Sequence, residues 1–218
     1  IPRTLAMSVY GDLDISIIKE LPPGRKKTTT VHRYDKDRLS VYKFLRDQIK
    51  LGRQVYIVYP LINESEKLDY KDLVDGYESM LRDFPRPEYQ VGILHGKMKS
   101  IDKNIEMERF VNNKTQILVS TTVIEVGVNI PNASVMMIES SERFGLSQLH
   151  QLRGRVGRGK AQATCILMFK SNLSDNSKKR INILKKSNDG FYISEEDMKL
   201  RGFGDLLGFK QSGVKNFK

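Results

Sequence analysis

Short apolar runs alternate with amphipathic segments along most of the chain. Runs of four to six apolar residues between Gly, Pro or polar residues indicate strands that are buried on both faces. Stretches with an apolar residue every three or four positions indicate helices that pack one face against a sheet. The apolar runs predict strands at residues 55–59, 91–94, 117–120, 135–138 and 164–169, and the β-branched stretch at residues 28–34 is also predicted to be a strand. The predicted helices are residues 35–51, 66–83, 100–111 and 146–152.

This alternation predicts an α/β fold with a doubly wound parallel sheet over residues 28–170. Parallel strands need long crossover connections, and helices in those connections cover both faces of the sheet. Residues 1–27 end in a Pro-Gly-basic break and are expected to form a linker segment between domains.

Residues 171–218 follow a different pattern. Two predicted helices, residues 171–187 and 194–201, are separated by the turn sequence Asn188-Asp189-Gly190. Ser194 followed by three acidic residues is typical of a helix N-terminus. We expect a helical hairpin attached to the α/β domain; two solvated surface helices are the alternative.

The charge and the single cysteine narrow the class of protein. Lys and Arg number 37 against 26 Asp and Glu, which gives a formal charge of +11. Cations that neutralise phosphates release condensed counterions, so this excess favours nucleic acid, although solvated lysine-rich faces are an alternative. Cys165 lies in an apolar run and is expected to be a core residue in a reducing cytoplasm. No apolar run has the length of a membrane span, and no signal peptide or membrane partner is expected.

The strongest motif is the run Gln151-Leu152-Arg153-Gly154-Arg155-Val156-Gly157-Arg158-Gly159. Its glycines let the backbone approach a ligand, and its guanidinium groups match phosphate oxygens in a two-pronged geometry. The run resembles motif VI of superfamily 2 helicases, Gln-x-x-Gly-Arg-x-Gly-Arg. That resemblance implies that Arg155 and Arg158 are catalytic, acting on the γ-phosphate of ATP held by a neighbouring domain, and that Gln151 binds the nucleotide. A basic surface loop is the alternative.

Two other patterns resemble parts of a nucleotide-hydrolysis site and are rejected. Residues 154–160 match the start of a P-loop, but Ala161 stands where Ser or Thr would hold Mg²⁺, and the segment follows a helix rather than a strand. Glu139 ends an apolar run as in a Walker B strand, without a partner loop. The chain alone is therefore expected to bind neither ATP nor Mg²⁺ and to hold no metal; both would belong to a complete two-domain enzyme.

Further matches follow in the order of the helicase motifs. Residues 117–131 resemble motif V, in which a strand ends in hydroxyl residues that hold a DNA phosphate. The block at residues 93–98 resembles the one that follows motif IV. These resemblances imply DNA contacts from Lys97, Ser120, Thr121 and Thr122. They also imply nucleotide contacts from Glu125, Gly127 and Asn129, the last at a position where related helicases often have Asp.

The two ends of the chain narrow the resemblance to the RecG helicase family. Residues 1–7 resemble the tail of motif III, and residues 10–25 resemble the RecG continuation. Residues 197–213 resemble the translocation motif, in which a helical hairpin and loop couple motif VI to movement along duplex DNA. This implies coupling roles for Arg201 and Gln211, while Phe203 and Lys210 depart from the family pattern.

The resemblance implies the RecA-like second motor domain of an ATP-dependent DNA helicase. Such an enzyme would act on branched DNA, including stalled forks and four-way junctions, in recombination and repair. Its expected partners are duplex and branched DNA and a missing N-terminal motor domain of the same chain. The alternatives are the motor domain of a transcription-repair coupling translocase and a non-catalytic nucleic-acid-binding module that borrows the fold.

Overall fold

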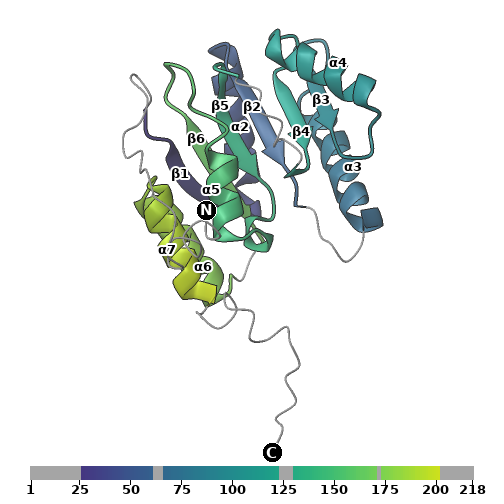
Figure 1. The fold of residues 1–218 in the computed structure, drawn as a ribbon. Helices are drawn as coiled ribbons and strands as arrows, with labels where there is room; N and C mark the ends of the chain where they lie inside the picture. Colours follow the sequence, from purple (N-terminus) through teal and green to yellow (C-terminus); the bar gives the residue numbers. More distant parts are fainter. Residues whose placement is uncertain (1–25, 61–65, 123–129, 171–172, 202–218) are drawn as a thin grey trace, which may run out of the picture.

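The computed structural model describes residues 26–60, 66–122, 130–170 and 173–201. These residues form a sheet flanked by helices on both faces (Figure 1). The strands are β1 (Thr29–Tyr34), β2 (Gln54–Val58), β3 (Val91–Leu94), β4 (Ile117–Ser120), β5 (Ala133–Ile138) and β6 (Thr164–Phe169). The helices are α2 (Arg38–Lys50), α3 (Glu66–Asp83), α4 (Ser100–Val111), α5 (Leu146–Arg153), α6 (Asp175–Lys186) and α7 (Gly190–Arg201), with the 3₁₀ segments η1 (Asp35–Asp37) and η3 (Ser141–Arg143).

The strands pair in parallel in the order β1-β6-β5-β2-β4-β3. Strands β2 and β5 lie at the centre and are buried at every position, which explains why all their residues except Gln54 and Ser134 are apolar. The chain leaves β2 toward one edge of the sheet and β5 toward the other, so the topological switch point lies between their carboxyl ends. The predicted doubly wound α/β fold is confirmed.

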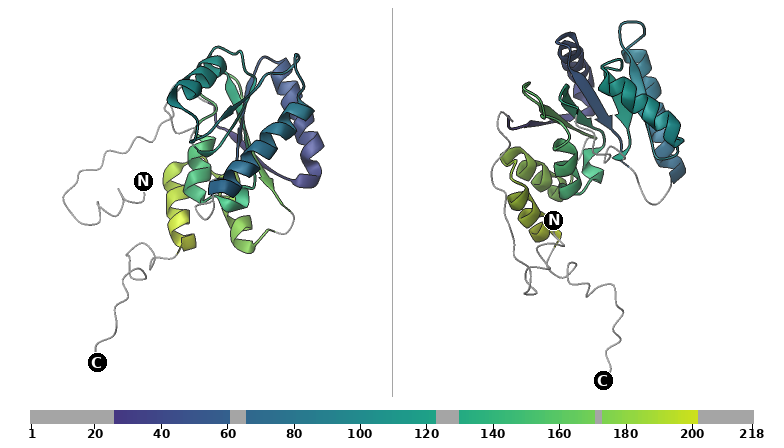
Figure 2. Two further views of the ribbon diagram at one scale, coloured as in Figure 1. Left: turned by 90° about the vertical axis from the view of Figure 1, so that its right-hand side faces the viewer. Right: turned by 45° about the horizontal axis from the view of Figure 1, so that its top comes forward.

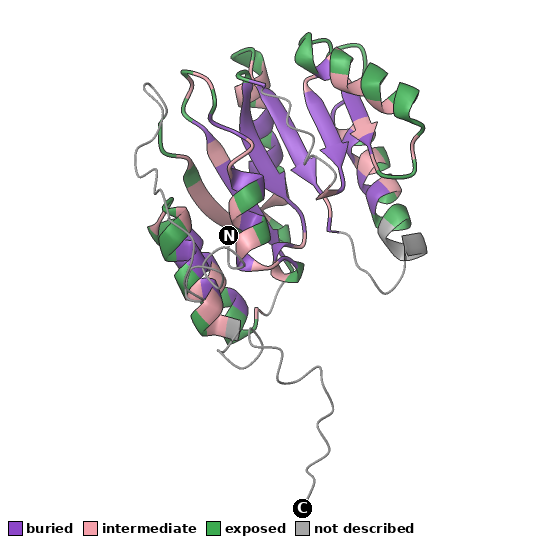
Figure 3. Cartoon of the chain, viewed as in Figure 1, coloured by how far each residue is buried: buried purple, intermediate pink, exposed green. Residues whose placement is uncertain are grey.

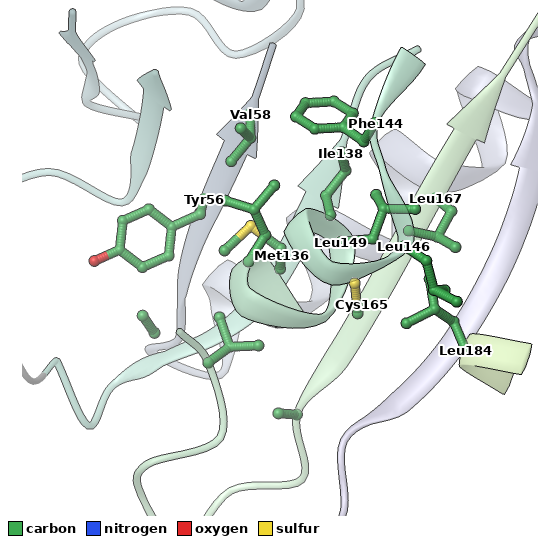
Figure 4. Close-up of a cluster of buried hydrophobic side chains, with 14 of the residues drawn as sticks. Tyr56, Val58, Met136, Ile138, Phe144, Leu146, Leu149, Cys165, Leu167 and Leu184 are labelled. Carbon is green, nitrogen blue, oxygen red and sulfur yellow. The ribbon is translucent and has the colours of Figure 1, made fainter. Parts of the chain in front are cut away.

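The sheet divides the core into two layers because alternate side chains of a strand point to opposite faces. On β2, Val55 and Ile57 pack with residues of α2 and α3, whereas Tyr56 and Val58 pack with residues of α4 and α5. Figure 3 shows the strands buried between helices whose outer faces are exposed. Figure 4 shows the second layer, in which side chains of α5 cover β5 and β6. Each fully buried aliphatic side chain contributes about 1.5–3 kcal/mol to folding.

The two C-terminal helices pack against each other and against α5, and α6 also packs against β1 at one edge of the sheet (Figure 2). Helix α6 begins after Ser174, whose hydroxyl oxygen accepts a hydrogen bond from the Ser177 N–H at 3.2 Å. The Ser147 hydroxyl of α5 donates to Asp197 of α7 at 2.6 Å. The predicted hairpin is therefore a packed part of the domain.

The predicted start of α7 at Ser194 is wrong, since the helix begins four residues earlier at Gly190. The Asp189 carboxylate accepts the Phe191 N–H at 2.8 Å, and the Asp189 carbonyl accepts the Ile193 N–H at 3.1 Å. Asp189 thus takes the N-terminal capping position that the sequence had suggested for Ser194. Ser194 lies inside the helix and is buried.

Candidate nucleotide and nucleic-acid interfaces

The loop between α5 and β6 carries the two arginines predicted to be catalytic. A tight turn follows α5, in which the Arg155 N–H donates to the Leu152 carbonyl at 2.9 Å. Val156 is fully buried and anchors the loop, while Arg155 is half-buried and Arg158 is exposed. Gln151 is exposed on α5 one turn earlier. All three polar side chains predicted here are therefore at least partly open to solvent.

Two glycines let this loop pack closely on its surroundings. Gly157 has a φ of +76°, which disfavours any residue with a Cβ. A Cβ on Gly159 would lie 2.3 Å from the carbonyl oxygen of Pro131, so the two backbones touch with no room for a side chain. Pro131 ends the segment that resembles motif V. The structure thus joins the segments that resemble motifs V and VI backbone to backbone.

The charges of Arg155 and Arg158 act together on Tyr56 of β2. Tyr56 is buried, with its ring 4.9 Å from that of Phe110, and Figure 4 shows its hydroxyl pointing away from α5. Burial raises the pKa of Tyr56, and the charges of Arg158 and Arg155 oppose that rise. Both guanidinium groups therefore lie within electrostatic range of this hydroxyl.

A third arginine of the same run has a different environment. Arg153 is 2% exposed, and its guanidinium donates to the Leu184 carbonyl at 2.6 Å and to the Thr30 hydroxyl at 3.2 Å. It also lies 3.0 Å from Nδ1 of His150, which must accept because a guanidinium only donates. Burial lowers the pKa of Arg153. Burial and the charge of Arg153 lower the pKa of His150 to about 4. Sequence reasoning missed this role, because the motif leaves the Arg153 position unspecified.

The predicted DNA contacts meet at the carboxyl ends of β3 and β4. These strands pair with Leu94 opposite Ser120, and the Thr121 N–H donates to the Leu94 carbonyl at 3.3 Å. The turn that holds Lys97 and the segment Ser120-Thr121-Thr122 therefore lie side by side. Lys97 is exposed and Thr122 is half-buried, whereas Ser120 and Thr121 are 0% and 3% exposed. Lys97 and Thr122 therefore form the surface of this edge, and Ser120 and Thr121 lie beneath it.

This edge is polar and positively charged. Three buried atoms here, Ser120 Oγ, Thr121 Oγ1 and His95 Nδ1, have no hydrogen-bond partner in the part of the chain that the structure describes. Lys103 donates from Nζ to the Gly96 carbonyl at 2.8 Å. Burial and the charges of Lys103 and Lys97 lower the pKa of His95. Cations and hydroxyl groups together are what a phosphate oxygen requires from a protein surface.

Glu139 and residues 154–160, rejected above as a Walker B residue and a P-loop, have surroundings that differ from those of a nucleotide-hydrolysis site. Arg38 binds the Glu139 carboxylate with both terminal nitrogens, at 2.5 and 3.0 Å, and this pairing raises the pKa of Arg38. Residues 154–160 follow α5 and precede β6, the reverse of a P-loop.

Across the described ranges, no cluster of three or more His, Cys, Asp or Glu residues could hold a metal ion. In the same ranges, no helix is long and apolar enough to cross a membrane.

Several predicted residues lie outside the described ranges. Glu125, Gly127 and Asn129 belong to the undescribed part of the motif V segment, and Gln211 to the C-terminal end. Arg201 is the last residue of α7, and its side chain is not described. Residues 1–25 of the predicted linker segment also lie outside.

Comparison with known proteins identifies the family. The helicase conserved C-terminal domain family matches residues 39–160, which is more than half of the chain. The chain belongs to this family. A second family, described as ATP-dependent DNA helicase RecG, domain 3, C-terminal, matches residues 187–217 of this helicase C-terminal domain.

This helicase domain is similar over its whole length to several RecG proteins. The ATP-dependent DNA helicase RecG of Bacillus subtilis is 52% identical over 219 residues, covering 100% of the chain and 32% of that protein. RecG of Synechocystis is 50% identical over 217 residues, covering 100% of the chain and 26% of that protein. A solved structure of RecG bound to a three-way DNA junction has a TM-score of 0.78 and 42% identity, covering 100% of the chain and 28% of that structure. The chain thus spans about a third or less of these relatives, and the predicted resemblance to RecG is confirmed.

Proposed function

We propose that this chain acts as the second motor domain of an ATP-dependent helicase that works on branched DNA. The relatives are named ATP-dependent DNA helicase RecG, and a RecG structure was solved bound to a three-way DNA junction. The contact of Gly159 with the Pro131 carbonyl carries the proposal, because it places the arginine loop directly against the C-terminal end of the segment that resembles motif V. We infer that a change at the arginine loop on nucleotide binding acts on the motif V segment at this contact.

On the nucleotide side, Arg155 and Arg158 would contact the γ-phosphate of ATP bound to the first motor domain. Phosphoryl transfer leaves little covalent chemistry to the protein, so added positive charge near the transferred group carries much of the rate. The fit is supported by the exposure of Arg158, by the partial exposure of Arg155 and by the effect of both charges on the pKa of Tyr56. Gln151, Glu125, Gly127 and Asn129 would complete the nucleotide contacts. ATP supplies the phosphoryl group, and Mg²⁺ would be held by the other motor domain.

On the DNA side, a backbone phosphate would meet Lys97 and Thr122 first. Ser120 and Thr121 are buried, so their unpaired hydroxyl groups would contribute from beneath, by a small opening of the edge. Phosphate contacts of this kind carry no base information. We therefore expect the chain to bind duplex and branched DNA without sequence preference.

The hairpin of α6 and α7 would couple these events to movement. Arg153 joins the arginine loop to α6 through the Leu184 carbonyl, which supports a common motion of loop and hairpin. Arg201 and Gln211 would extend this coupling beyond α7. We place the enzyme in the cytoplasm, since its single cysteine is buried and unpaired.

The match of residues 187–217 to RecG domain 3 favours this function over the transcription-repair coupling translocase. A non-catalytic binding module that borrows the fold remains a separate hypothesis, and it requires nothing of Arg155 and Arg158. The two hypotheses therefore differ in whether a complete motor built with this domain depends on those arginines.

Two hydrolysis measurements test the proposal. The chain alone should release no phosphate from ATP, with or without a three-way DNA junction; turnover that stays with the chain through purification would contradict a missing first motor domain. The chain should also replace the corresponding part of Bacillus subtilis RecG and restore DNA-stimulated hydrolysis and unwinding of branched DNA. A folded chimaera that lacks DNA-stimulated turnover would refute the motor function.

A DNA-binding measurement tests the second half of the proposal. Fluorescence anisotropy of the chain with a labelled junction should show binding that weakens steeply with salt, because each neutralised phosphate releases roughly one counterion. Affinity should be the same for junctions of different sequence. Binding that ignores salt, or that depends strongly on base sequence, would contradict phosphate recognition.

A further inference from the structure

Tyr70 contacts both side chains that flank Gly96 at the proposed DNA edge. The Lys97 ammonium is 5.3 Å from the centroid of the Tyr70 ring. The His95 ring meets the same ring edge-on, with centroids 5.1 Å apart and an interplanar angle of 75°. Tyr70 belongs to α3, whereas Lys97 and His95 belong to the turn after β3. The contact therefore brings a residue from outside the helicase motifs into the edge.

Core packing does not account for the placement of Tyr70. Its side chain is 41% exposed, while the apolar contacts of α3 with the sheet come from buried residues such as Leu73 and Met80. No hydrogen bond holds its hydroxyl in the described part of the chain. What the ring does contact is the Lys97 ammonium and the His95 imidazole, and the contact with Lys97 is a cation–π pair.

A cation–π contact with Tyr70 would favour phosphate binding by Lys97 in two ways. A lysine ammonium ends a flexible four-carbon stem, so an exposed lysine loses much rotamer freedom when it binds a phosphate. Lys103 lies near the same turn through its bond to the Gly96 carbonyl, so like charges also act to push Lys97 away. An aromatic face that attracts the ammonium offsets both effects before any phosphate arrives.

We propose that Tyr70 is a positioning residue of the DNA edge, whose ring holds the Lys97 ammonium in place to receive a backbone phosphate. The proposal rests on the proposed function, because it takes the ligand to be DNA. Tyr70 acts through Lys97 and through its ring, so its hydroxyl is dispensable. Tyr70 contacts no base, so the effect is the same for duplexes of any sequence.

A double-mutant cycle on the chain tests this, with anisotropy on duplex DNA over a salt series. Lys97→Ala should weaken binding and reduce the slope of log affinity against log salt by about 0.9, the loss of one phosphate contact. Tyr70→Ala should weaken binding about two- to fivefold, the value of one exposed cation–π contact. Tyr70→Phe should bind like the unmodified chain. In the Lys97→Ala background, Tyr70→Ala should have no further effect. Lys43→Ala, at an exposed lysine of α2, is the matched charge control and should leave the slope unchanged.

The outcomes separate the inference from the function on which it rests. If Lys97→Ala lowers affinity and slope but Tyr70→Ala does not, or if the two effects add, Tyr70 does not position Lys97 and only the inference fails. If Tyr70→Phe is as weak as Tyr70→Ala, the hydroxyl acts instead of the ring and the inference also fails. If Lys97→Ala changes nothing, the DNA edge itself is wrong. A preference of the Tyr70 effect for single-stranded DNA would identify base stacking and overturn the proposal.

A measurement without DNA keeps the inference testable on its own. The ring current of Tyr70 should shift the NMR signals of the Lys97 Cε protons in the free chain. Tyr70→Phe should keep that shift and Tyr70→Ala should remove it, with circular dichroism confirming that both variants are folded. A Lys97 signal unaffected by Tyr70→Ala would overturn the inference whatever the DNA results.

Discussion

The Arg153 guanidinium donates a 2.6 Å hydrogen bond to the carbonyl oxygen of Leu184, which joins the last residue of α5 to the last turn of α6. Carbonyls in the last turn of a helix have no partner within that helix, so this bond also caps α6. The arginine loop and the hairpin are thereby attached to the same residue. Arg155 and Arg158, two and five positions along the chain, make no such side-chain hydrogen bond to any residue that the structure describes, and both are more exposed.

Replacing Arg153 by Met should lower the free energy of unfolding by about 1–3 kcal/mol, because three acceptors lose a buried donor. These are the Leu184 carbonyl, the Thr30 hydroxyl and His150 Nδ1. Arg158→Met is the matched control and should change stability by less than about 0.5 kcal/mol, as is usual at the surface. Urea denaturation followed by circular dichroism measures both. Equal stabilities for the two variants would show that Arg153 has no structural role.

The stability of the fold should fall in mild acid through His150. Its pKa is lowered from 6.5 to about 4 by burial first and by Arg153 second, while Asp189 opposes the shift. The unfolded chain therefore takes up this proton before the folded chain does. The stabilisation is present above pH 6.5 and is lost as the pH falls toward 4, by up to about 2 kcal/mol after allowance for solvent screening.

His150→Gln should remove this part of the pH dependence while keeping an acceptor for Arg153. Unfolding free energies measured from pH 7 to pH 4.5 should therefore fall less steeply for the variant than for the unmodified chain. Carboxyl groups contribute equally to both curves, so the difference between them isolates His150. Parallel curves would mean that His150 titrates normally in the folded state.

The contact between Gly159 and Pro131 should be intolerant of any side chain. Gly159→Ala places a Cβ 2.3 Å from a backbone oxygen, so one of the two loops must move, at a cost of about 1–3 kcal/mol. Gly154→Ala is the control: its backbone is right-handed helical, and the nearest atom to a Cβ is 3.2 Å away. Thermal unfolding should separate the two variants, and equal midpoints would argue against a rigid joint between the motif segments.

The elements that the sequence predicted well are those fixed by local pattern. The bounds of α3, α4, β3, β4 and β6 agree with the predicted ranges, because short apolar runs and helical spacing depend only on burial of one or two faces. The start of α7 was missed because Ser194 has the chemistry of a cap, and only packing against the rest of the domain buries it. The side chain of Ser194 is suited to capping a helix, but its buried place in the fold puts it inside α7 instead.

At the candidate site, the sequence predicted the motif residues but not the residues whose role depends on tertiary contacts. Arg153, Arg155 and Arg158 are chemically equal in one short run, and the motif pattern singled out the last two. Only the fold shows that Arg153 is a buried structural donor. Tyr70 could not be found at all, because its contact with Lys97 joins two elements that are distant in the chain. Motifs thus indicate residues that are expected to touch a ligand, whereas contacts such as that of Tyr70 with Lys97 are found only from coordinates.

Arg155→Ala and Arg158→Ala should each collapse DNA-stimulated ATP hydrolysis in the chimaera with Bacillus subtilis RecG. An arginine that neutralises charge on the transferred phosphoryl group is worth on the order of 10³–10⁵ in turnover. ATP affinity should change far less, since most ground-state contacts would belong to the first motor domain. Lysine should rescue poorly, because a point charge cannot reproduce the planar two-pronged contact of a guanidinium.

Steady-state hydrolysis at saturating DNA measures the effect of these changes, with Arg33→Ala as a control at an exposed arginine of β1. That control should keep near-normal turnover, because Arg33 lies on the edge strand and is not part of the arginine loop. Both loop variants should fold normally, since Arg155 and Arg158 are not buried donors like Arg153. If the folded loop variants keep most of their turnover, the loop is only a basic surface and the catalytic assignment is wrong.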